Sequence, residues 1–142
     1  MDLKQAIEKR HTVRKFLDKP LTADNIKKLE TRINDLNKTL TPNAHVVGIL
    51  EIGYGATQGH PHKSKNAQSV ATYDGNPPQW FTAGVQAALL APTAVNRQGF
   101  TITGTKDKVQ ITYKKAPFDM EDLGIVKHHF QIAAGASNIT FI

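Results

Sequence analysis

Residues 79–113 read QWFTAGVQAALLAPTAVNRQGFTITGTKDKVQITY, in which a helix, a turn and a hairpin follow one another. Apolar residues recur at helical spacing in the first part. Its Gly and Ala content predicts a helix over 79–91 that packs closely against another helix. Pro92 ends this helix. Two alternating strands, over 100–103 and 109–113, are joined by a turn at GTKDK and predict a hairpin.

Further elements are expected on both sides of this segment. They are a short helix that ends near Arg10, an amphipathic helix over 23–39 with Thr22 as N-cap, a buried strand over 46–52, a helix from Asp119 or Asp122 to a C-terminal Gly135, and a terminal strand over 138–142. Residues 53–78 are punctuated by Gly and Pro and predict a long connecting loop. The order of elements predicts an α+β fold, with a mixed or antiparallel sheet packed with helices, in a single compact domain over 1–142.

Length and composition narrow the function classes. A chain of 142 residues can bury a core without disulfides or metals, and this chain has no cysteine. Disulfide scaffolds, thiolate zinc sites, iron–sulfur clusters and cysteine nucleophiles are therefore excluded. The stretch with the fewest charges, 66–96, is interrupted by Asp, Gly and Pro, so it does not predict a transmembrane helix. The N-terminus lacks the pattern of a signal peptide. We expect a cytoplasmic protein that does not bind membranes.

The net charge of +6 invites a nucleic-acid interpretation, but its distribution does not favour one. Residues 1–40 contribute +4 and the other 102 residues contribute +2. No Arg-rich stripe interleaved with aromatic residues is present, nor is a helix-turn-helix or zinc-finger spacing. We expect no nucleic-acid partner. Sequence-specific binding that survives moderate salt would revive that interpretation.

Two short basic patterns could bind a phosphate. In an extended chain Arg10, Thr12 and Arg14 point the same way, and two guanidinium groups with a hydroxyl suit a phosphate. Lys63 and Lys65 alternate in the same manner within the Gly- and Pro-rich region. Taken alone, each pattern also fits a solvated basic turn, because charged side chains are normally exposed.

Asn96 and Gln98 lie in the segment between the helix that ends at Pro92 and the strand that begins at Phe100. Amides offer both donors and acceptors, so this pair could contact the edge of a heteroaromatic ring or a ribityl chain. An ordinary turn with Asn in a left-handed conformation is the alternative.

The six histidines do not predict a metal site. His60 and His62 have no carboxylate nearby in sequence, and the adjacent His128 and His129 would point about 100° apart on a helix. No nucleotide-binding glycine loop and no serine-hydrolase elbow is present. We name no catalytic side chain.

Taken together, four segments resemble the FMN-dependent nitroreductase family. EKRHTVRKFLDKPLTADNIKKL resembles the family's R-x-S-x-R helix end and the turn and helix that follow, with Thr12 in place of Ser. IGYGATQGHPHKSK resembles its strand and K-x-R loop, with Lys65 in place of Arg. WFTAGVQAALLAPTAVNRQGF resembles its A-P-S-x-x-N-x-Q-P-W region, and PFDMEDLGIVKHHFQIAAG resembles the next helix in the branch with two fused halves.

The resemblance implies a nitroreductase-like fold and an FMN site. Arg10, Thr12, Arg14, Lys63 and Lys65 would hold the phosphate, and Asn96 and Gln98 would meet the ribityl chain or ring. In such enzymes NAD(P)H reduces the flavin, which then reduces a small-molecule acceptor such as a nitro compound or quinone.

The chain departs from the family pattern in its spacing. Barely a dozen residues separate the predicted helix end near Leu40 from the GYG strand, so the middle of the first half is missing. This departure motivates a second hypothesis, a degenerate member without flavin that acts as a structural or interaction subunit. It also motivates a homodimer that completes the fold, with any flavin near the interface, because small residues surround much of the helix over 79–91.

Overall fold

The computed structural model describes residues 1–38, 51–135 and 139–142. These residues form two compact units, which are described separately. The core unit comprises Met1–Arg10 and Pro61–Ile142, and the α2 unit comprises His11–His60. Most of the strand expected over 46–52 lies outside the described residues. Glu51 and Ile52, which are described, are exposed and belong to no strand.

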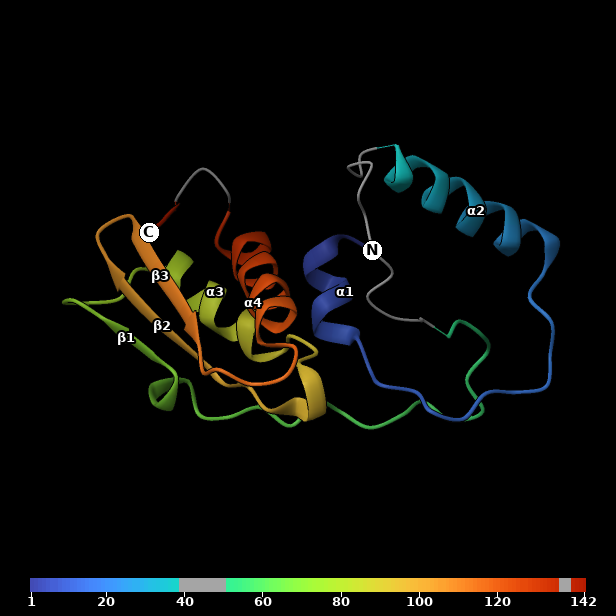
Figure 1. Cartoon of the computed structure of the whole chain (residues 1–142), viewed down its shortest axis with the longest axis horizontal. Helices are drawn as coiled ribbons and strands as arrows, with labels where there is room; N and C mark the ends of the chain where they lie inside the picture. Colours follow the sequence, from blue (N-terminus) through green and yellow to red (C-terminus); the bar gives the residue numbers. More distant parts are fainter. Residues whose placement is uncertain (39–50, 136–138) are drawn as a thin grey trace. The chain divides into compact units, whose positions relative to one another are not determined.

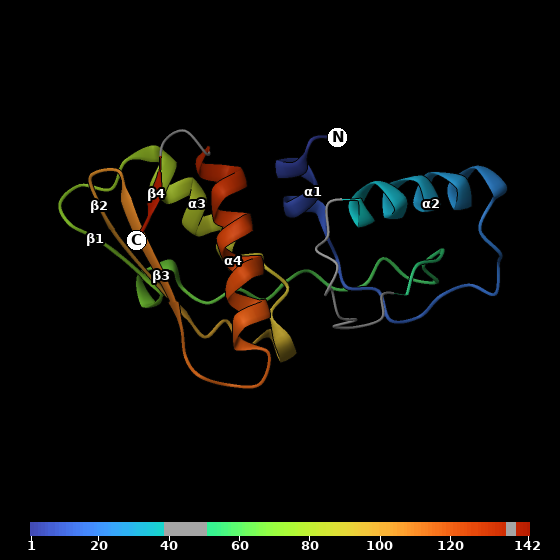
Figure 2. The same cartoon turned by 45° about the horizontal axis from the view of Figure 1, so that its top comes forward.

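A mixed four-stranded sheet organises the core unit (Figure 1). The strands are β1 (Ala71–Tyr73), β2 (Phe100–Thr105), β3 (Lys108–Tyr113) and β4 (Thr140–Phe141), in that spatial order. β2 and β3 form the predicted antiparallel hairpin, whereas β1–β2 and β3–β4 are parallel pairs. Figure 2 shows β4 beside β3. The predicted α+β class with a mixed sheet is therefore confirmed.

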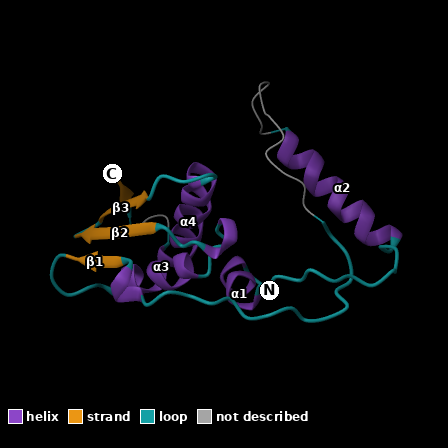
Figure 3. Cartoon of the chain, turned by 60° about the horizontal axis from the view of Figure 1, so that its bottom comes forward, coloured by secondary structure: helices purple, strands orange, loops and turns teal. Residues whose placement is uncertain are grey.

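One face of the sheet is buried under α3 (Gln79–Leu89) and α4 (Asp119–Ala134), so the unit has two layers (Figure 3). Burial alternates along β2, with Phe100, Ile102 and Gly104 buried and Thr101 and Thr103 exposed. This period of two is that of a sheet with one solvated face.

The two helices pack closely because α3 presents a glycine to an aromatic ring. A Cβ atom on Gly84 would lie 2.6 Å from the ring of Phe130, which is fully buried on α4. This confirms the close helix packing predicted from the Gly and Ala content. α3 ends at Leu89, two residues before the predicted end, since the Leu90 N–H bonds to Ala87 O in a tighter turn.

α1 (Leu3–Lys9) completes the core unit by packing against α3 and α4. Its first turn is held by a capping box, in which Asp2 Oδ1 accepts from the Gln5 N–H at 2.8 Å. Ile7 is buried as its helical spacing indicates, but Leu3 on the same predicted face is 66% exposed. The predicted connector over 53–78 contains a 3-10 helix, η1 (Ala67–Ser69), and β1.

The α2 unit is built from the amphipathic helix α2 (Ala23–Asn37) and two extended segments. Thr22 caps the helix as predicted, since its Oγ1 accepts from the Asn25 N–H at 3.3 Å. The extended segments pair antiparallel at Thr12 with His60 and at Phe16 with Gly55. No described residue of this unit is buried. In the described parts of the chain, no helix has the length and apolar character needed to cross a membrane.

A pair of glycine substitutions tests the helix packing. We expect Gly84→Ala to lower the free energy of unfolding by about 1–3 kcal/mol, because the new methyl group has no space beside Phe130. Gly124→Ala on α4 meets nothing within 4 Å. It should stabilise the protein by up to about 1 kcal/mol through helix propensity. Chemical denaturation of both variants measures the difference, and equal effects would contradict the packing.

Candidate anion-binding site

The side-chain amide of Gln98 joins two segments of the core unit. Gln98 is 3% exposed; its Oε1 accepts from the Lys65 N–H at 2.9 Å, and its Nε2 donates to Lys63 O at 2.8 Å and to Asn96 Oδ1 at 2.9 Å. Both amide hydrogens and the oxygen are therefore used within the protein. This amide holds the 63–65 loop and leaves no donor for a ligand.

Asn96 and Gln98 contact Lys63 and Lys65, although the two pairs are distant in the sequence. Asn96 Nδ2 donates to Lys63 O at 2.9 Å, and Lys65 Nζ donates to Gln98 O at 2.9 Å. Lys63, Lys65 and Asn96 are themselves exposed. Four of the seven residues singled out in the sequence are thus brought together, three of them facing solvent.

The electrostatics of this cluster favour an anion. Within the described residues, both ion pairs lie on or directly after α2, namely Lys28 with Asp24 and Lys38 with Asp35. Lys63 and Lys65 therefore have no carboxylate partner in the described part of the chain. Two exposed lysine side chains on one loop, of which Lys65 has its ammonium group beside Gln98 O, can supply charge and hydrogen bonds to a phosphate.

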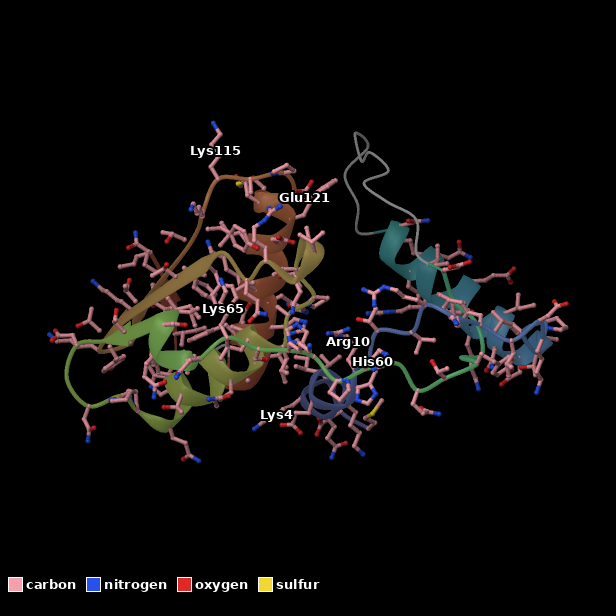
Figure 4. All side chains as sticks on the ribbon, turned by 90° about the horizontal axis from the view of Figure 1, so that it is seen from below. Lys4, Arg10, His60, Lys65, Lys115 and Glu121 are labelled. Carbon is pink, nitrogen blue, oxygen red and sulfur yellow. The ribbon has the colours of Figure 1, made fainter. Side chains whose placement is uncertain are left out.

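Arg10 lies in the same unit, at the end of α1 (Figure 4). Its backbone is extended (φ −64°, ψ 127°), and its Nη2 donates to Leu90 O at 3.4 Å. Burial lowers the pKa of Arg10 from its ordinary value, yet a guanidinium remains charged at neutral pH. The half-buried Arg10 thus adds a positive charge near His62 of the 61–65 loop.

Side chains from three parts of the core unit contact three of the carbonyl groups at the end of α3. Arg10 bonds to Leu90 O, Ser64 Oγ donates to Leu89 O at 3.1 Å, and His129 Nδ1 lies 3.3 Å from Ala87 O. The last carbonyls of a helix lack partners within it and carry the negative end of its dipole. This arrangement ties the 61–65 loop to the helical layer.

From their spacing in the sequence, His62 and His129 could be weighed only as metal ligands, and no sequence pattern places them at the end of α3. His62 Nδ1 lies 3.3 Å from Ser64 Oγ, and its Nε2 is buried toward the Ala91 backbone without the geometry of a full hydrogen bond. Burial, and then the charge of Arg10, lower the pKa of His62. Burial is also the main cause that lowers the pKa of His129. Among the described residues, no three His, Asp or Glu side chains gather as metal ligands would.

Thr12 and Arg14 belong to the α2 unit. Thr12 is bridged to His60, as expected for an extended segment, and Gly59 beside it is left-handed (φ +70°). A Cβ atom on Gly59 would lie 2.4 Å from Thr12 O, so only glycine fits this crossing. Arg14 is exposed and has no carboxylate partner among the described residues.

The backbone around Asn96 is strained. Val95, Asn96 and Gln98 all have positive φ, of 48°, 53° and 46°. Such conformations cost about 1–3 kcal/mol each in non-glycine residues and cluster at functional sites. The left-handed Asn96 expected from an ordinary turn is present, but within a longer irregular segment.

Asp122 and Tyr113, which the sequence did not single out for the site, contact this strained segment. Asp122 Oδ1 accepts from the Ala94 N–H at 2.8 Å, and its Oδ2 accepts from the Tyr113 hydroxyl at 2.7 Å. Burial, with the Asp122 carboxylate as a further cause, raises the pKa of Tyr113. The sequence offers Asp122 only as an acidic residue at the start of a helix, and the fold shows that it is buried and which N–H group donates to it.

The histidines at the end of α3 predict a pH-dependent stability. The folded state favours their neutral forms, so their contribution is complete above the ordinary pKa of 6.5 and is lost as pH falls through their lowered pKa values. We expect the melting temperature to fall between about pH 7.5 and pH 5.5, and the double variant His62→Gln/His129→Gln to flatten this slope. His128→Gln, at an exposed position on α4, is the control. An unchanged slope in the double variant would contradict the assignment.

Comparison with known proteins identifies the family. The family model described as "Putative TM nitroreductase" matches residues 2–47 and 38–134. A crystal structure of a Thermotoga maritima protein of the same nitroreductase description is similar in fold, with 19% identity, a TM-score of 0.66, and coverage of 94% of this chain and 83% of that chain. No curated protein matches the sequence. The two matched segments span most of the chain, which therefore belongs to the TM nitroreductase family.

Proposed function

We propose that this chain is an FMN-dependent NAD(P)H oxidoreductase of the nitroreductase type. The observation that carries the proposal is the convergence of Lys63, Lys65 and Asn96 around the buried Gln98 amide. Both ammonium groups lack a carboxylate partner among the described residues, as the phosphate of a cofactor would require. Family membership supports the flavin as the source of that phosphate.

The flavin phosphate would be held by Arg10, Lys63 and Lys65 of the core unit. Thr12 and Arg14 are included through the resemblance and their sequence positions next to Arg10. Two hydrogen bonds support this grouping. Arg10 donates to Leu90 O and Ser64 donates to Leu89 O, so Arg10 and the 61–65 loop both contact the C-terminal end of α3.

The amides have different proposed roles. Asn96 is exposed and would contact the ribityl chain or the ring, whereas Gln98 would act by fixing the loop that carries both lysines. When bound, the flavin accepts a hydride from NADH or NADPH and reduces a nitro or quinone-like acceptor. No side chain of this protein is assigned as a general acid or base.

A second candidate is a family member that lacks flavin and acts as a structural or interaction subunit. The uncovered apolar side chains of α2 favour it, because Ile26 and Ile33 are 43% and 53% exposed. The purified protein separates the two candidates: a flavoprotein is yellow, with absorbance at about 450 nm.

Substitutions at the proposed phosphate ligands test the flavin assignment. We expect Lys63→Ala and Lys65→Ala each to weaken FMN binding about ten- to a hundredfold, since each removes a charge-assisted contact worth about 1.5–3 kcal/mol. Both side chains are exposed, so folding should be unaffected. Quenching of flavin fluorescence on titration measures the affinity.

The matched controls are Lys115→Ala in the core unit and Lys38→Ala directly after α2, which remove the same charge at other exposed positions. Equal affinities of all four variants would refute the phosphate assignment. A colourless wild-type protein that does not quench FMN fluorescence would favour the second candidate.

We also propose that the protein is a homodimer. The small residues of α3 predict cover on several sides, and within one chain α1, α4 and the sheet supply that cover. α2 is the element that lacks cover, because its apolar stripe at Ile26, Leu29 and Ile33 is not buried. Stripes of this kind are normally covered, and two-fold dimers are the commonest oligomers.

Sedimentation tests the dimer. We expect a stable dimer at micromolar concentration, with an interface above roughly 2,000 Å² as obligate dimers have. Ile33→Lys should shift the protein toward monomer, whereas Asn34→Lys adds the same charge off the apolar stripe and should not. A folded wild-type monomer would rule out the dimer.

A further inference from the structure

The strained segment 94–98 carries Asn96 and Gln98, and therefore determines where the 63–65 loop lies. Both amides donate to one acceptor, the carbonyl oxygen of Lys63. The backbone at Val95, Asn96 and Gln98 is left-handed, and in this conformation both side-chain amides reach the Lys63 carbonyl oxygen. Non-glycine residues keep such a conformation only when surrounding contacts enforce it.

Asp122 supplies one of these contacts from the helical layer. Its side chain is 3% exposed and lies in the first turn of α4. One carboxylate oxygen accepts from the N–H of Ala94, where the strained segment begins. The other oxygen accepts from the hydroxyl of Tyr113 at the end of β3. A single buried carboxylate thus links helix, hairpin and segment.

Tyr113 and Thr93 fix the far end of the segment. A Cβ atom on Gly99 would lie 2.9 Å from the Tyr113 ring, so the ring packs directly on the backbone that follows Gln98. Thr93 Oγ1 accepts from the Gln98 N–H at 3.1 Å. The segment is therefore held at both ends, and its side chains reach the 63–65 loop from a fixed frame.

We propose that Asp122 and Tyr113 are positioning residues for the anion site. They act through Ala94 and Gly99 on Asn96 and Gln98, and through these on Lys63 and Lys65. The inference rests on the proposed function for the identity of the anion, FMN phosphate, but the positioning itself is a property of the protein without ligand.

The direction in which one substitution changes the FMN affinity distinguishes a positioning role from a purely electrostatic one. Asp122→Asn removes a negative charge, and this alone should strengthen the binding of an anion. It also leaves one acceptor oxygen where the carboxylate had two, so the side chain cannot accept from both the Ala94 N–H and the Tyr113 hydroxyl, and the hold on the segment should weaken. We expect FMN binding to weaken by about tenfold or more despite the favourable change in charge.

The control variant is Glu121→Gln, the same change one residue earlier in the first turn of α4 (Figure 4). Glu121 is exposed, and its effect on the helix dipole should match that of Asp122. Its FMN affinity should stay within about twofold of wild type. Tyr113→Phe keeps the ring on Gly99 and removes only the hydroxyl, so it should weaken binding in the same direction with less risk to folding.

A double-mutant cycle tests whether Asp122 acts through the lysines. Lys63→Ala should weaken FMN binding less in the Asp122→Asn background than in wild type, because a displaced Lys63 has less contact to lose. Strictly additive effects, or tighter FMN binding by Asp122→Asn, would overturn the proposal.

Hydrogen exchange on the ligand-free protein gives a readout independent of FMN. In Asp122→Asn and Tyr113→Phe, the amides of Ala94, Gln98 and Lys65 should exchange faster, while Ile102 in β2 should not. Unchanged exchange at 94–98, or equal acceleration at Ile102, would refute positioning. If wild-type protein binds no FMN, the proposed function fails while this measurement still decides the positioning.

Discussion

The buried amide of Gln98 is the contact on which the candidate site depends. It is 3% exposed and uses its oxygen and both hydrogens to join Lys65, Lys63 and Asn96. A buried amide must satisfy all of these groups, because an unsatisfied one would cost about 1–3 kcal/mol. The loop with two lysines is therefore fixed by the hydrogen-bonding requirement of one side chain from the segment before β2.

Segment 94–98, which carries Gln98, is in turn held by hydrogen bonds from the helices and strands around it. Segment 94–98 is irregular because it connects a helix that ends against Arg10, Ser64 and His129 to a strand whose first residue is buried. Asp122 and Tyr113 then supply polar contacts that the short connection cannot supply itself. Unusual backbone at the site is thus matched by hydrogen bonds from α4 and β3.

The two units differ in what holds them together. The core unit contains every buried residue among the described parts of the chain, and Gly84, Phe130 and an aromatic cluster form its centre. The α2 unit is held by backbone pairing between 12–17 and 54–60 and by local caps. An amphipathic helix without cover gains little from its apolar stripe, which is why a second copy is the proposed cover.

The sequence by itself determined the α+β class, the bounds of the helices to within two residues where they are described, the β2–β3 hairpin and the family. These features are local: apolar periodicity, capping residues such as Thr22, and Pro and Gly as terminators act over a few residues. Through motifs that resemble those of a family, it also placed Lys63 and Lys65 with Arg10, Thr12 and Arg14 at a phosphate, and Asn96 and Gln98 at the rest of the same cofactor.

Tertiary structure alone decided how these residues are used. The sequence treated Gln98 as a ligand contact, whereas burial commits its amide to the protein. Asp122 and His129 carried no local signal of their partners, because these are a backbone N–H group 28 positions away and a backbone carbonyl group 42 positions away. Tyr113 and His62 carried none of the contacts that they make in the fold. Which carbonyl or N–H group a side chain meets depends on how helices and strands pack, and packing is a property of the whole fold.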